Sequence, residues 1–289
     1  MEFLTPVLMR GTLSHAVEPQ YAEAVELLVP LNASVSGMTV SESRAAVIAL
    51  TEQKRQLCQQ ASRYLAAAGT LLSDIDRLAL EATDSNKIAK LASRIAEKEF
   101  GRPRRRIGAE KVRFLSGIRG DSILLFSETA KQLAERIYLL EDSFGPSSRL
   151  LLEHLRALAR KTGLDIISCA CPMSGGQKVE HLFIPSLSLG FMTQNHFLSP
   201  DISPCKVVNS RRFTDREELK RRKIRISFNK KAAGQMFLQA AGLFSEAREI
   251  QSRLESLYRP AIDFELVESL TNGLIETIGS GRSAETAPR

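Results

Sequence analysis

The sequence predicts a mixed α/β protein that is mostly helical. Residues 41–81 carry apolar residues at spacings of three, four and seven, which is typical of an amphipathic helix, and a second long helix is predicted from residue 214 or 215 to 258. Between them, short apolar runs bounded by turn residues predict strands. Apolar residues make up 43% of the 289 and charged residues 25%, which is close to the globular average and excludes extended disorder as the default state.

The composition also limits the location and the partners. No run approaches the roughly 18–20 apolar residues that a membrane span needs, and the N-terminus lacks the basic start and apolar stretch of a signal peptide. Four cysteines do not make a disulfide scaffold, so we expect a cytoplasmic protein. The net charge of +7 and the pI near 9.4 permit an anionic partner, whereas the absence of Trp leaves few stacking platforms for single-stranded nucleic acid.

The first hundred residues are predicted to hold one strand and two helices. The strand is short and apolar, Gly69 interrupts the first helix, and Asp84 or Ser85 caps the second helix. These elements are strand Phe3–Met9, helix 41–81 and helix 84–100. Gly and Pro then end the helix, and the arginines of Arg102–Arg106 predict an exposed basic linker over residues 102–110.

After residue 111 the pattern alternates between strands and helices. Each strand is a short apolar run, and the helices start near polar or capping residues. The predicted strands are 112–118, 122–126, 136–140, 164–169, 182–184 and 187–192. The predicted helices are 127–135, 149–161, 214 or 215 to 258, and 263–278. The small, polar residues 279–289 predict a disordered tail.

The two halves of the chain share an internal repeat. Tyr64–Gly69 matches Phe237–Gly242 inside a long helix, and Thr12–His15 matches Thr193–His196 further upstream. The second copy follows several strands and a helix that have no counterpart before Phe3, so we expect the first copy to be truncated. The resulting division is a truncated, mostly helical first repeat at 1–101, the linker at 102–110, a second domain at 111–278 and the tail at 279–289.

The truncated repeat needs a surface that covers it. Its strand has unpaired amides and carbonyls, and its long helix has an apolar stripe. We therefore expect residues 1–100 to dock on the second domain, on a protein partner or on another copy of the chain. In the docked form the two long helices are predicted to pack through Leu65, Leu72, Leu238 and Leu243 or their neighbours.

The strand at 136–140, the loop after it and the following helix have the layout of a phosphate-binding unit. In such a unit, glycines and a Gly-Lys-Ser/Thr sequence wrap backbone amides around the phosphates at the helix N-terminus. Here Asp142 stands at the first glycine position and places a carboxylate where phosphate charge would arrive. Pro146 removes an amide donor. The candidate phosphate contacts that remain are Gly145, Ser147, Ser148 and Arg149.

Around this loop the chain resembles the bacterial tandem P-loop ATPase-like proteins. The family has motifs like HCxxDP, DHxIIPEL, TSN and PAxDF, and the matching stretches here are Leu164–Pro172, Glu180–Leu187, Thr193–Asn195 and Pro260–Phe264. The resemblance implies a P-loop NTPase-like second domain with long helical arms. It fails at the catalytic motifs, because the first P-loop is missing, the second is degenerate, and Ser174–Gly176 replaces the acidic residue after the HC motif.

The degenerate loop favours a pseudo-NTPase, a non-catalytic module kept for binding or regulation. The alternative is an active ATP-binding NTPase or nucleotide kinase in which Arg149 replaces the usual lysine, and ATP and magnesium are expected only in that case. A second alternative is a basic protein that contacts nucleic acid, against which a solvated helix face is the simpler interpretation. Its candidate residues are Arg211, Arg212, Lys220, Arg221, Arg222, Lys223, Arg225, Lys230 and Lys231, in a stretch with ten basic and three acidic side chains.

No catalytic residue and no metal site is predicted. Cys169 and Cys171 lie two apart with His181 downstream, but this spacing differs from that of zinc sites and favours ordinary thiols. His15 and His196 occupy equivalent turns of the repeat, where a structural role is favoured over acid–base chemistry.

Overall fold

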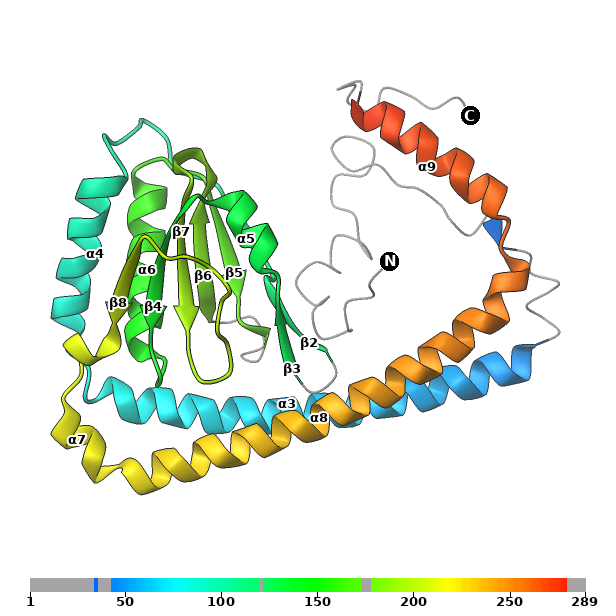
Figure 1. Ribbon diagram of the computed structural model, residues 1–289, viewed down its shortest axis with the longest axis horizontal. Helices are drawn as coiled ribbons and strands as arrows, with labels where there is room; N and C mark the ends of the chain where they lie inside the picture. Colours follow the sequence, from blue (N-terminus) through cyan, green and yellow to red (C-terminus); the bar gives the residue numbers. More distant parts are fainter. Residues whose placement is uncertain (1–33, 36–42, 120–121, 173–177, 280–289) are drawn as a thin grey trace. The chain divides into compact units, whose positions relative to one another are not determined.

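The computed structural model describes residues 34–35, 43–119, 122–172 and 178–279. It is a mixed α/β protein, 62% helical, with a six-stranded mixed sheet flanked by helices (Figure 1). This confirms the predicted mixed α/β class. Among the described residues, 60–242 form one compact unit, and 34–59 together with 243–279 form a second. Within the described ranges, no helix combines the length and apolar character needed to cross a membrane.

Strands and helices alternate along the first unit. The sheet strands are β1 (Glu110–Arg113), β4 (Arg136–Glu141), β5 (Ile166–Ala170), β6 (Val179–Ile184), β7 (Leu189–Gln194) and β8 (Lys206–Asn209), and β2 (Ser116–Arg119) and β3 (Ser122–Leu125) form a separate antiparallel pair. The helices are α4 (Ser85–Glu99), α5 (Ser127–Leu133), α6 (Pro146–Lys161) and α7 (Arg216–Arg221). Two long helices, α3 (Arg44–Leu80) and α8 (Lys223–Tyr258), each contribute to both units.

The order of the strands determines which chain segments meet at one edge of the sheet. The order is β1-β5-β6-β7-β4-β8, and only β6 runs antiparallel to its neighbours. The carboxyl ends of the five parallel strands therefore share one edge with the start of β6. In open α/β sheets this carboxyl edge is where ligands generally bind.

Both faces of the sheet are buried, as the alternation of side chains along the strands requires. On β4, Tyr138 belongs to one core cluster and Ile137 to the other. Helices α4 and α6 cover the first face through residues such as Ile88 and Leu152, and α5 covers the second face through Ala130. The four central strands, β4 to β7, are consequently mostly buried, which is typical of sheets covered on both sides.

Helix α4 joins the first half of the chain to the second. Its N-cap, Asp84, accepts a hydrogen bond of 3.0 Å from the amide of Lys87. At the other end, Glu99 accepts hydrogen bonds from the Tyr138 hydroxyl at 2.7 Å and from Arg136 Nη1 at 2.6 Å. Residues 85–99 therefore pack on the sheet that the second half of the chain builds.

Within the first unit, α3 and α8 are joined by a polar contact and an apolar one. The carboxylate of Asp74 accepts hydrogen bonds from Arg225 at 2.7 and 2.8 Å and from Asn229 at 2.7 Å. Next to it, a small core cluster contains Ile75, Leu78 and Ile226. The two long helices do pack together here, and the predicted contact residue Leu72 lies against this cluster, whereas Leu238 is 51% exposed.

The second unit contains the far ends of the same two helices and a final helix. Leu50 of α3 packs with Ile250 and Leu254 of α8. Helix α9 (Phe264–Gly279) begins after Asp263, whose Oδ1 accepts a hydrogen bond of 3.0 Å from Leu266 N.

Other boundaries differ from the sequence predictions. The run 112–118 was predicted as one strand, but it is divided between β1 and β2, which belong to different sheets. The long helix predicted from residue 214 or 215 is interrupted at Arg222, whose amide bonds back to the carbonyls of Leu219 and Lys220 in a tight turn. Strand β8 was not predicted. The predicted strand Phe3–Met9, the turn Thr12–His15 and the tail from residue 280 lie outside the described residues.

The packing of α4 on the sheet can be tested at Ile88, which is fully buried. We expect Ile88→Ala to lower the free energy of unfolding by about 3 kcal/mol, because it removes buried methyl groups and leaves a cavity. Lys90→Ala, on the exposed face of the same helix, should change it by less than ~0.5 kcal/mol. Urea denaturation followed by circular dichroism measures both. Equal effects of the two substitutions would show that α4 is not packed on the sheet.

Candidate functional site

The candidate site lies where β4 ends and α6 begins, at the carboxyl edge of the sheet. The loop between them consists of Asp142, Ser143, Phe144 and Gly145, and Pro146 is the first residue of the helix. The first amides of a helix have no partner within the helix, and they carry the positive end of its dipole. This position therefore calls for an anion or for a capping acceptor.

The carboxylate of Asp142 is that acceptor. Its Oδ1 accepts hydrogen bonds from the amides of Phe144 at 3.1 Å and Gly145 at 3.0 Å. Its Oδ2 accepts a bond of 2.8 Å from the amide of Ser148. Only 3% of Asp142 is exposed. The loop thus binds a carboxylate of its own chain with the backbone donors that a phosphate-binding loop would present to its ligand.

Gly145 gives the loop its conformation. Its φ is +107°, a region that side-chain-bearing residues rarely adopt. A Cβ at this position would lie 3.0 Å from Asp76 Oδ1 and 3.0 Å from Lys178 Nζ. Both the backbone geometry and the close approach of these two charged groups require glycine here.

The charge on Arg149 is already neutralised by carboxylates. Its Nη2 lies 2.8 Å from Asp76 Oδ2, and its Nε donates to Asp76 Oδ1 at 3.3 Å. Glu153 lies 3.4 Å from its Nη1. The hydrogen bond to Asp76 is the main cause of the raised pKa of the guanidinium. Asp76 belongs to α3, so the first half of the chain supplies this partner.

The structure places the four predicted phosphate contacts together, within the loop and the first turn of α6. The amides of Gly145 and Ser148 donate hydrogen bonds to the Asp142 carboxylate. The Ser148 hydroxyl donates to the Gly145 carbonyl at 3.1 Å. Ser147 is buried, with 4% exposed. The sequence predicted that these residues share one loop, but it did not reveal their internal hydrogen-bond partners. Binding of phosphate by these residues stays a prediction.

A buried polar pair lies at the same edge, at the start of β6. Glu180 is 3% exposed and accepts a hydrogen bond of 3.2 Å from Ser116 Oγ. Burial raises the pKa of Glu180 and lowers the pKa of His181 to about 3. The Nδ1 of His181 accepts a hydrogen bond of 3.2 Å from the amide of Thr193, which joins β6 to β7. Burial therefore disfavours the charged form of both groups, and His181 is neutral at neutral pH.

A hollow of about 340 Å³ adjoins the loop. The residues that line it include Asp76, Phe144 and Arg149 on one side, and Lys178 and Glu180 on the other. Cations and carboxylates are therefore mixed in its wall, so that the hollow has no single charge preference.

The cysteines and histidines do not form a metal site in the described part of the chain, where no three His, Cys, Asp or Glu residues gather. Cys169 and Cys171 are buried free thiols, and burial raises the pKa of Cys169 to about 12.

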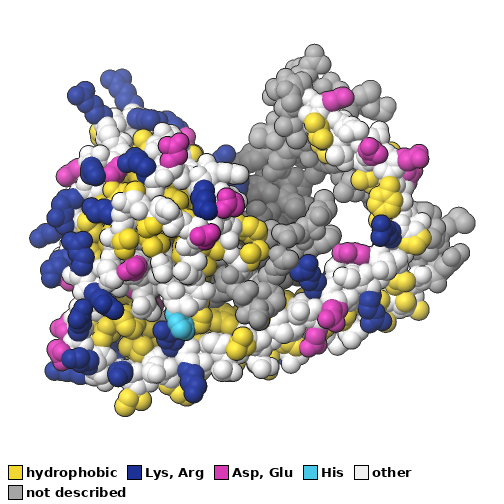
Figure 2. Space-filling view, in the orientation of Figure 1, with side chains coloured by type: hydrophobic (Ala, Val, Ile, Leu, Met, Phe, Trp, Pro, Cys, Tyr) yellow, Lys and Arg dark blue, Asp and Glu magenta, His cyan; other side chains and the backbone are white. Residues whose placement is uncertain are grey.

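Much of the basic stretch 211–231 is paired with acids. Lys220, Arg221 and Arg222 form ion pairs with Glu217 or Glu218 at 2.6–3.3 Å, and Arg225 pairs with Asp74 at 2.7 Å. Lys and Arg side chains gather on the side of the first unit where α4 and α7 lie (Figure 2). The ion pairs weaken the case for a nucleic-acid stripe along this stretch, because paired cations give little gain on phosphate binding.

The fold and this edge define a mixed α/β protein with a strand–loop–helix unit whose loop amides bond to its own carboxylate. No protein-family model, curated protein or solved structure matches the chain.

We expect Asp142→Ala to lower the free energy of unfolding by about 3 kcal/mol. It removes an acceptor shared by three amides, and bonds to a charged group contribute about 1.5–3 kcal/mol each without being additive. Asp215→Ala is the matched control: Asp215 also accepts two amides at a helix start, but it is exposed. A cost of about 1 kcal/mol is expected there. If both variants lose the same stability in urea denaturation, the Asp142 contacts are ordinary capping contacts.

The buried His181 predicts a pH dependence of stability. Its pKa is about 3 in the folded protein and 6.5 without burial, so the unfolded state binds the proton first as the pH falls. Stability from this group is complete above pH 6.5 and declines by about 1.4 kcal/mol per pH unit toward pH 3. The raised pKa of Glu180 acts in the opposite direction, because its stabilising contribution is lost as the pH rises above 4.5.

Comparison of the parent chain with His181→Asn separates the two effects. Asparagine keeps an acceptor for the Thr193 amide but does not titrate. The stability difference between the two proteins should shrink as the pH falls from 6.5 to 4.5. Parallel curves in urea denaturation across this range would contradict the neutral, buried histidine.

Proposed function

We propose that the chain is a degenerate P-loop ATPase-like protein that acts in the cytoplasm as a non-catalytic binding or regulatory module, a pseudo-NTPase. The observation that carries this proposal is the acceptance of three loop amides by Asp142. A phosphate group in the same place would have to displace a buried carboxylate and would meet its negative charge.

The ion pair of Arg149 supports the same conclusion. For Arg149 to act on a phosphate, its guanidinium would have to leave Asp76, to which it makes two hydrogen bonds. Asp76 would then remain beside Gly145, where the phosphates of a working loop lie. Two carboxylates thus oppose the entry of a polyphosphate, and the loop has neither the lysine nor the magnesium-binding hydroxyl that would offset them.

The surroundings of the loop support a P-loop-like ancestry. The loop follows a buried parallel strand, precedes a 16-residue helix and lies at the carboxyl edge of the sheet. The stretches that carry the family resemblance also meet this edge: Glu180 is the second residue of β6, and Asn195 follows β7. A protein partner, or another copy of the chain, remains the expected target of the module.

Calorimetric titration of the full chain with ATP and magnesium tests the proposal. We expect no binding tighter than about millimolar and no hydrolysis above background. Each lost charge-assisted contact removes about 1.5–3 kcal/mol, and two such losses account for the ~4 kcal/mol between micromolar and millimolar affinity.

Arg149→Ala and Arg156→Ala provide the matched pair of variants. Both arginines are on α6 and both pair with a carboxylate, but Arg156 pairs with Glu110, away from the loop. Micromolar ATP binding that is lost in Arg149→Ala and kept in Arg156→Ala would replace the pseudo-NTPase by an active NTPase or kinase.

A further inference from the structure

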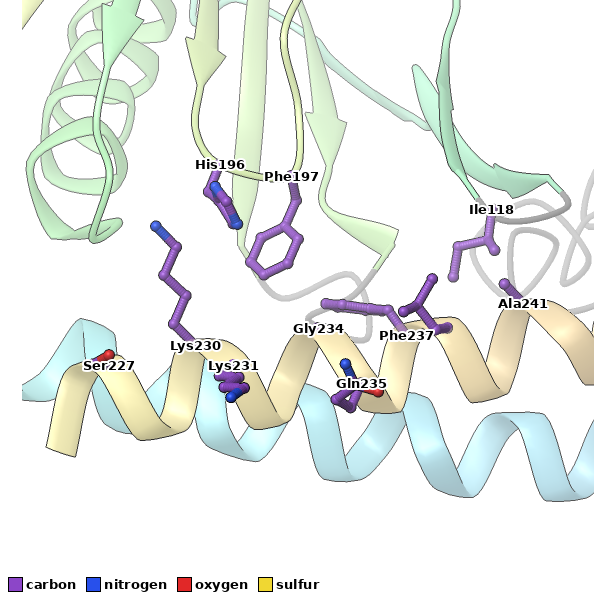
Figure 3. A pocket seen from close by; sticks show the side chains of 11 residues that line it. Ile118, His196, Phe197, Ser227, Lys230, Lys231, Gly234, Gln235, Phe237 and Ala241 are labelled. Atoms are coloured by element: carbon purple, nitrogen blue, oxygen red, sulfur yellow. The ribbon is translucent and has the colours of Figure 1, made fainter. Parts of the chain in front are cut away.

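A second hollow, of about 630 Å³, lies along α8 and outside the loop at residues 142–149. Figure 3 shows His196 and Phe197 on one side, carried by the segment after β7, and the side chains of α8 on the other. Ile118 of β2 closes the far end. The lining residues of α8 run from Ser227 to Ala241, about 21 Å along the axis at 1.5 Å per residue. We refer to this hollow as the α8 groove.

One end of the α8 groove is cationic. Lys230 and Lys231 line it, and in Figure 3 the Lys230 ammonium points toward His196. Across the described residues, neither lysine has an acidic partner within 4 Å, whereas Arg225 on the same helix is paired with Asp74. The lining contains no Asp or Glu. This end therefore has two uncompensated positive charges, which favour an anionic group.

The middle and the other end are aromatic and apolar. The rings of Phe197 and Phe237 pack edge to face with centroids 5.2 Å apart, and His196 packs against Phe197 at 5.1 Å. Leu238 lies next to Phe237 and is 51% exposed. A planar ring can pack against such a cluster, because aromatic groups prefer tilted or offset contacts at these distances.

Gly234 lies on the floor of the groove, between the lysines and the phenylalanine. A glycine inside a helix costs about 1 kcal/mol relative to alanine. Nothing lies within 4 Å of a Cβ built at Gly234, so packing does not require glycine at this position. The absent side chain leaves the floor open between the charged end and the aromatic end.

We propose that the α8 groove binds a small planar anion: an aromatic ring system that carries a carboxylate, sulfonate or phosphate group. The ring packs on Phe197 and Phe237, and the anionic group lies at Lys230 and Lys231. The volume is within the range of small-molecule sites, about 300–1,000 Å³. Single-stranded nucleic acid also combines rings with anions, but the groove has its three rings in one cluster rather than spaced along a track, which favours one small ligand.

The test uses the full chain and 8-anilinonaphthalene-1-sulfonate, a fluorescent planar anion. We expect a dissociation constant of about 10–100 μM, and at least a tenfold loss of affinity in Lys230→Glu/Lys231→Glu and in Phe237→Ala. Lys223→Glu is the charge control, since Lys223 is an exposed lysine of α8 outside the groove. It should change the affinity by less than twofold.

Substitutions of Gly234 distinguish loss of binding caused by a blocked groove from loss of binding caused by unfolding. Gly234→Ala should raise the melting temperature, because it improves helix propensity. Gly234→Leu should abolish binding of the probe while circular dichroism still shows the parental helix content. Unchanged probe binding in Gly234→Leu, or equal effects of all the lysine substitutions, would overturn the proposal.

A parallel titration with oligo-dT tests whether the groove binds single-stranded nucleic acid instead of a small planar anion. If the oligonucleotide binds through Lys230, Lys231 and Phe237 at least tenfold more tightly than the sulfonate, the site belongs to nucleic acid and the proposal is wrong. His196, Phe197 and Lys230 line both the α8 groove and the hollow beside the loop at residues 142–149, whereas Phe237 and Gly234 do not line that hollow. The effects of Phe237→Ala and Gly234→Leu therefore test the groove independently of whether the chain binds ATP.

Discussion

The need for negative charge at the start of α6 governs the arrangement of the carboxyl edge. A short loop connects the parallel strand β4 to the 16-residue helix α6. The unpaired amides and the positive end of the dipole at the start of this helix lie in a buried position. Asp142 meets this need from within the loop, at 2.8–3.1 Å from three amides. The left-handed Gly145 follows from it, because the chain must turn tightly for these amides to converge on one carboxylate.

Helix α3 is tied to the same edge through charge. Arg149, on the first turn of α6, requires a carboxylate once it is partly buried, and Asp76 of α3 supplies it. Two residues earlier on α3, Asp74 joins the helix to Arg225 and Asn229 of α8. The loop, α3 and α8 are thus linked by neighbouring carboxylates.

The sequence predicted most helices and central strands because each of them is specified by a pattern of neighbouring residues. Periodicity identified α4, α6 and the C-terminal end of α8, and the apolar runs identified β4, β5 and β7. Strand β8 was missed because it has only four residues and the exposed Val207 gives it no buried run. Asp142 was recognised as a charge in the phosphate position, but its three amide partners depend on the φ of Gly145. Asp76 could not be predicted as the partner of Arg149, since 73 residues separate them.

The distribution of paired and unpaired cations distinguishes the loop from the α8 groove. At the loop, Arg149 forms ion pairs with Asp76 and Glu153, so an incoming anion must compete with these carboxylates. At the groove, Lys230 and Lys231 have no acidic partner within 4 Å among the described residues, so an anion there gains charge attraction without displacing anything. The chain thus satisfies the anion position at the start of α6 internally and leaves positive charge available on α8. On electrostatic grounds an added anion is therefore favoured where the cations are unpaired, which is the basis of the ligand proposed for the α8 groove.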